Sequence, residues 1–181
     1  MFQRFRNNAV NSTPLNPSQL QALNQANQLV ASGQPILAAP IFAQLAGNME
    51  TSNHPRRAAN LHAQAAHAYA DGKDEQDALA QARRALSLFI QNQMVQRTPV
   101  FYANITRKFT NKGMKNSAEA LAKEFGPVVG GIPAPAPAAA QHGNLPTNCP
   151  KCGAPLHPSE ATWVDAITAE CAYCGAAIRT S

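Results

Sequence analysis

Residues 66–89 read AHAYADGKDEQDALAQARRALSLF. The second half of this stretch carries apolar residues at spacings of four, three and four, which form one face of a helix with 3.6 residues per turn. These residues are Ala78, Ala82, Ala85 and Phe89. Asp71 and Gly72 interrupt the pattern and predict a turn. The stretch therefore predicts a helical hairpin, in which small alanine side chains let two helices approach closely.

The hairpin pattern recurs with a period of 40 residues when segments start at Gln19, Ala59 and Pro99. Each segment has a large apolar residue near the end of its first helix, a glycine near the turn and an alanine in its second helix. The recurring sets are Leu29, Tyr69 and Phe109; Gly33, Gly72 and Gly113; and Ala38, Ala78 and Ala118. We expect six helices, near residues 17–31, 35–48, 55–71, 74–93, 98–112 and 115–125.

The second unit resembles the tetratricopeptide repeat family through a shared set of small and aromatic positions. These are Ala66, Tyr69, Ala78, Ala82 and Ala85. No unit has the family's tryptophan at its fourth position or its closing proline, and the period is 40 and not 34. The resemblance implies a solenoid of helix hairpins over residues 17–126. The alternative is a single six-helix bundle in which the period is coincidental.

Residues 126–148 form a segment with no charged residue, four glycines and five prolines. Alternating Ala-Pro favours extended polyproline II, at ~3.1 Å per residue, so we expect a semi-rigid spacer that separates its neighbours by several tens of Å. The predicted organisation is mainly α. It consists of an N-terminal extension (1–16), a helical repeat domain (17–126), a Pro/Ala/Gly-rich linker (127–148) and a small β module (149–181).

The four cysteines form two pairs, Cys149-Pro150-Lys151-Cys152 and Cys171-Ala172-Tyr173-Cys174, with 18 residues between them. This C-x₂-C-x₁₈-C-x₂-C spacing is typical of a four-cysteine zinc site. Two residues between thiolates let a tight turn aim both sulfurs at one ion. Gly153 and Gly175, each directly after a pair, supply the unhindered backbone that such a turn needs. A redox dithiol and an iron site are the alternatives.

The module resembles the zinc ribbon family, in which two cysteine knuckles clamp a small β-hairpin. The resemblance implies one structural Zn²⁺ on Cys149, Cys152, Cys171 and Cys174. Strand pieces are expected at residues 162–164 and 167–169. Four thiolates close the coordination shell, so no position remains for a substrate. His157 is expected on the surface.

The formal net charge is +5, but it is spread unevenly. Residues 55–125 carry +5, whereas residues 149–181 carry −1, so the module most often linked to nucleic acid is the least basic part. The densest basic stretch includes Arg107 and Lys108. These two residues either complement a helix C-terminus or contact an anionic partner. Trp163 either packs within the ribbon or forms a ligand platform.

No catalytic set can be assembled from the five histidines and the scattered carboxylates, so we expect a protein that is not an enzyme. His62 is expected to be a packed histidine. The chain has no apolar run of about 18 residues and starts without a secretory signal pattern, which favours a cytoplasmic protein.

The leading hypothesis is a protein–protein interaction adaptor, in which the helical scaffold binds one partner and the ribbon docks a second. It involves no membrane and no small-molecule substrate. The alternative is a nucleic-acid-associated zinc-ribbon factor of the transcription or translation type, which the charge distribution does not favour. A third hypothesis is a docking or ligase-like adaptor in a ubiquitin-like protein-modification pathway.

Overall fold

The computed structural model describes residues 15–132, 143–156, 161–163 and 166–180. Most of the expected N-terminal extension, the middle of the expected linker and His157 lie outside these residues. The described part contains six helices, as expected. They are α1 (Pro17–Ala31), α2 (Pro35–Thr51), α3 (Pro55–Asp71), α4 (Glu75–Gln91), α5 (Arg97–Asn111) and α6 (Lys115–Gly130).

The turns between the helices recur every 20 residues. Each contains one residue in the left-handed region, and these residues are Gly33, Asn53, Lys73, Gln93 and Gly113. Each turn also closes with the same pair of backbone hydrogen bonds, as in Gly33 N to Val30 O and Gln34 N to Leu29 O. This pair is the Schellman pattern that ends a helix. The 40-residue sequence period therefore corresponds to two helices and two equivalent turns.

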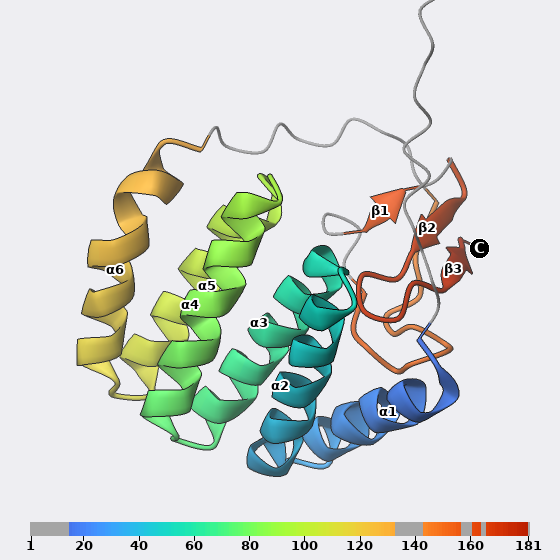
Figure 1. The fold of residues 1–181 in the computed structure, drawn as a ribbon, viewed down its shortest axis with the longest axis horizontal. Helices are drawn as coiled ribbons and strands as arrows, with labels where there is room; N and C mark the ends of the chain where they lie inside the picture. Colours follow the sequence, from blue (N-terminus) through green and yellow to red (C-terminus); the bar gives the residue numbers. More distant parts are fainter. Residues whose placement is uncertain (1–14, 133–142, 157–160, 164–165, 181) are drawn as a thin grey trace, which may run out of the picture.

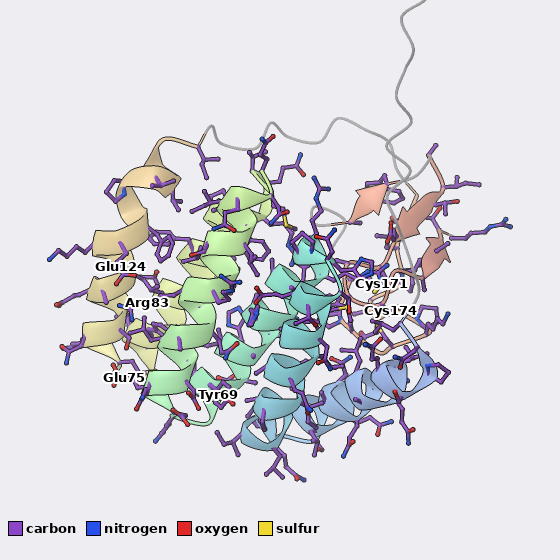
Figure 2. All side chains as sticks on the ribbon, in the orientation of Figure 1. Tyr69, Glu75, Arg83, Glu124, Cys171 and Cys174 are labelled. Atoms are coloured by element: carbon purple, nitrogen blue, oxygen red, sulfur yellow. The ribbon has the colours of Figure 1, made fainter. Side chains whose placement is uncertain are left out.

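The helices stack in chain order, from α1 at one end to α6 at the other (Figure 1). Each helix packs on its neighbours in the chain, and contacts also join α3 to α5 and α4 to α6. On the α4–α6 side, Arg83 Nε donates to Glu124 at 2.9 Å, and Ser117 Oγ donates to Glu75 at 2.7 Å. Figure 2 shows Arg83 and Glu124 facing each other. The fold is thus a row of three hairpins.

Alanine dominates the contacts between helices. Ala38, Ala78 and Ala118 of the recurring set are all buried, and Phe109 is fully enclosed, whereas Leu29 and Tyr69 are half-buried. His62 is also buried, and its ring nitrogens lie 2.7 Å from Glu50 and 2.6 Å from Gln81. The expectation of a packed histidine is confirmed, because these contacts tie α3 to both of its neighbours.

Two helices are longer than expected. α2 runs through Gly47 to Thr51, because the chain turns at the next left-handed residue, Asn53. α6 includes Pro127 and ends at Gly130. Pro127 lies in the last turn, where its missing N–H removes a single hydrogen bond. None of the described helices combines the length and apolarity needed to cross a bilayer.

The small module contains a three-stranded antiparallel sheet of order β1-β2-β3. The strands are β1 (Thr162–Trp163), β2 (Thr168–Glu170) and β3 (Ala177–Arg179). Trp163 pairs with Ala169, and Ala169 pairs with Ile178. β1 and β2 match the two expected strand pieces in the residues that the structure describes, while β3 was not expected from the sequence.

Two glycine substitutions should have opposite effects on stability. Gly113 has φ of 83°, so Gly113→Ala should lower the free energy of unfolding by about 1 kcal/mol, because alanine is strained there. Gly47 lies inside α2 with nothing within 4 Å of an added Cβ, so Gly47→Ala should raise it by about 0.5 kcal/mol. Urea denaturation measures both; equal changes would contradict the turn assignment.

Candidate metal centre and adjoining cleft

The four cysteines converge on one point. Their sulfur atoms all lie within 4.8 Å of one another, and all four residues are buried. Cys149 Sγ lies 3.8 Å from Cys174 Sγ, and Cys152 Sγ lies 3.8 Å from Cys171 Sγ. Sulfurs about 2.3 Å from a tetrahedrally coordinated ion are separated by about 3.8 Å. The four thiols therefore fit one tetrahedral metal ion, and none of them forms a disulfide.

Two equivalent turns hold these thiols, and we call them the first knuckle (149–154) and the second knuckle (171–176). In the first, Gly153 N donates to Cys149 O at 2.8 Å; in the second, Gly175 N donates to Cys171 O at 2.9 Å. Gly153 and Gly175 have φ of 72° and 73°. The left-handed glycine after each pair was predicted from the sequence, and it lets the chain reverse directly below the sulfurs.

The proximity of the thiols changes their acidity. Hydrogen bonds from the neighbouring thiols, with Cys152 the largest contributor, lower the pKa of Cys149. The pKa of Cys152 is raised, mainly by its hydrogen bond with Cys149 and further by burial. Without a cation, only part of the cluster can ionise. A divalent ion removes the repulsion between thiolates and lets all four bind it.

The knuckles dock on the helices. Asn27 of α1 donates its Nδ2 hydrogen to Cys152 O at 2.7 Å, and Asn60 of α3 donates to Ala172 O at 2.9 Å. Gln64 of α3 donates to the Tyr173 hydroxyl at 2.9 Å. The first knuckle is thus bonded to α1 and the second to α3. Figure 1 shows the small module beside the α1 end of the row, and Figure 2 shows Cys171 and Cys174 on the side nearest the helices.

An ion pair completes this interface. Arg57 Nη2 of α3 lies 3.3 Å from Glu170 Oε1 of β2, and both side chains are largely buried. Buried residues of the two modules form one continuous hydrophobic core. The expectation that the linker separates the modules is therefore wrong for this structure. Amide and guanidinium donors on the helices meet carbonyl, hydroxyl and carboxylate acceptors on the ribbon, and these contacts outweigh the freedom that the linker allows.

The docking residues of α3 were not predicted from the sequence. A signal for them does exist, because polar residues recur at helical spacing along one face of an otherwise alanine-rich helix. We call this set the α3 polar stripe; it comprises Arg57, Asn60, Gln64, His67 and Asp71. The first three contact the ribbon, and the last three line a cleft.

This cleft has a volume of about 550 Å³ and lies on the face formed by the first helix of each hairpin, α1, α3 and α5. We call that surface the first-helix face. Arg107 and Lys108, the predicted partner-binding residues, both line the cleft, together with Lys112. Trp163 lies on β1, half-buried, and does not line it.

Asp71 is the counter-charge in the cleft. Lys108 Nζ lies 2.5 Å from one Asp71 oxygen and Lys112 Nζ lies 3.1 Å from the other. Burial acts to raise the pKa of Asp71, but the hydrogen bonds and charges of Lys108 and Lys112 together lower it. Three cations and one carboxylate leave the cleft with a net positive charge.

Chelation should unfold the ribbon. About 30 residues bury too little surface to fold without the metal. We expect the full chain to bind one equivalent of Zn²⁺, and its removal to shift the emission of Trp163, the single tryptophan, to longer wavelength. Cys149→Ser should weaken binding while helical circular dichroism persists. An unchanged emission spectrum after chelation would contradict the metal assignment.

Acid should destabilise the cleft through His67. Burial, and secondarily the charge of Lys108, lower the pKa of His67 from 6.5 to about 4. Between these values the unfolded chain binds more protons, so stability falls as the pH falls. From pH 7 to pH 5 this group should cost about 2 kcal/mol. Chemical denaturation should show that His67→Leu loses less stability over this interval than the unsubstituted chain; equal losses would contradict the shift.

No protein-family model, no curated protein and no solved structure matches this chain. The organisation of the helices and the chemistry of the cysteine cluster therefore stand on the residues and the geometry alone.

Proposed function

We propose that this chain is a non-enzymatic adaptor for protein–protein interaction, a helical-repeat scaffold that carries a structural zinc ribbon. Three hairpins of equal length with equivalent turns support a repeat similar to the tetratricopeptide family. Four buried thiols at tetrahedral spacing support Zn²⁺, with iron as the alternative ion. A reducing compartment such as the cytoplasm keeps such thiols available for the metal.

The observation that carries the proposal is the polypeptide already bound on the first-helix face. Asn27 and Asn60 donate hydrogen bonds to main-chain carbonyls of the ribbon. Asparagine and glutamine side chains suit this task because each amide offers both donors and an acceptor to a peptide backbone. Next to the bound ribbon, the open cleft offers Gln64, Asn104 and Asn111. The face thus combines an occupied and an open part of the same chemistry.

The charge of the cleft favours an acidic peptide segment as its occupant. Arg107, Lys108 and Lys112 face a single carboxylate, Asp71. Residues 1–14 of the chain itself are basic and residues 133–142 are uncharged, so neither complements the cleft. Nucleic acid is less well supported. His67 is the only aromatic side chain among the described lining residues, and stacking platforms normally accompany single-strand binding.

Charge reversal in the cleft tests this function. Fluorescein-labelled octapeptides of alternating Glu and Ala should bind the full chain in an anisotropy assay, and matched peptides with Gln in place of Glu should bind weakly. Arg107→Glu combined with Lys112→Glu should weaken binding at least about tenfold, because attraction becomes repulsion at two positions.

The matched control is Lys123→Glu, an exposed position on α6 outside the cleft. It should change the affinity by less than about twofold. Equal losses from Lys123→Glu and from the cleft variant would contradict the site. Binding of random duplex DNA that exceeds peptide binding and falls steeply with salt would favour the nucleic-acid alternative.

A further inference from the structure

We infer that the metal-loaded ribbon is an intramolecular occupant of the first-helix face, and that metal loading sets how much of this face a partner can reach. The inference rests on the proposed function only in taking this face as the surface that binds partners. The occupied part lies over Asn27, Arg57, Asn60 and Gln64; the open part is the cleft.

The helices recognise the closed form of the knuckles. The two carbonyl acceptors belong to Cys152 and Ala172, which lie within the C-x-x-C turns. Their direction is set by the same turns that gather the sulfurs. A ribbon that has lost its metal no longer holds these carbonyls in place, so the donors on α1 and α3 lose their partners together.

The second knuckle also fits the helix by shape. A Cβ on Gly175 would lie 1.8 Å from Arg57 Nη2, so the guanidinium occupies the space that any side chain at residue 175 would need. The same guanidinium reaches Glu170 at 3.3 Å. Arg57 therefore contacts both the knuckle and the sheet, and its position depends on both being folded.

The α3 polar stripe is continuous between the two parts of the face. Gln64 donates to the Tyr173 hydroxyl and also lines the cleft. Release of the ribbon would expose Arg57 and Asn60, which are now 7% and 2% exposed. The open cleft would then extend along the whole length of α3. A loaded chain offers a short basic cleft, whereas a metal-free chain offers a longer groove.

Linkage makes the effect reciprocal. If the metal favours docking, docking favours metal binding by the same factor. Residues of the helical domain that touch no sulfur should therefore control metal retention. Partners beyond the direct ligands of a metal commonly change its affinity by about 10–100-fold when they are removed.

The first test measures Zn²⁺ affinity of the full chain by competition with a chromogenic chelator. Arg57→Ala and Asn60→Ala should each weaken binding about tenfold or more. Arg56→Ala is the matched control, because it removes the same charge from the adjacent, exposed position of α3. It should change the affinity by less than about twofold. Helical circular dichroism confirms that each variant is folded.

The second test measures the shape of the chain by small-angle X-ray scattering. Zinc-stripped protein, and a variant with all four cysteines replaced by serine, should have a larger maximum dimension than zinc-loaded protein. Arg57→Ala should raise the zinc concentration needed for the compact form.

Equal zinc affinities for Arg57→Ala and Arg56→Ala, or identical scattering with and without zinc, would overturn the inference. Neither experiment uses a peptide partner. Failure of the acidic peptides to bind would count against the proposed function and leave this coupling intact. Loss of the coupling would leave the cleft as a partner site.

Discussion

The contact between the α3 polar stripe and the two cysteine knuckles is the interaction on which the arrangement of this molecule depends. Arg57 and Asn60 would be costly to bury without partners, and the ribbon supplies a carboxylate and a carbonyl for them. The ribbon in turn has few apolar residues of its own and shares its core with the helices. Each module therefore completes the other, and the metal site lies at the centre of that exchange.

The helical row is well suited to carry such a contact. Its second helices, α4 and α6, are joined through Arg83–Glu124 and Ser117–Glu75, so one side of the row is held by polar contacts between hairpins. On the other side, α1 and α3 receive the ribbon, and α3 and α5 border the cleft. A stack whose units contact mainly their neighbours leaves one long face free for ligands. Here part of that face is already used.

The chemistry of the cysteine cluster and the chemistry of the cleft divide the tasks between structure and recognition. Four thiols around one ion leave no open coordination position, so the metal organises the backbone and takes no part in a reaction. The cleft, by contrast, presents positive charge and amide groups to solvent. The link between them is Gln64, which bonds to Tyr173 of the second knuckle and borders the cleft.

The sequence by itself determined the local elements. Periodic alanines, turn residues every 20 positions and two Gly-tailed C-x-x-C pairs specify the helices, their turns and the four ligands, because each depends on residues close together in the chain. It also placed Arg107 and Lys108 as candidates for partner contact. Only the tertiary structure decided that the ribbon rests on α1 and α3. That docking joins residues more than 100 positions apart, such as Asn60 and Ala172, through single polar contacts that leave no periodic trace. The Ala-Pro linker permits both separation and docking, so the choice between them lay in the matching of donors and acceptors, which exists only once both modules are folded.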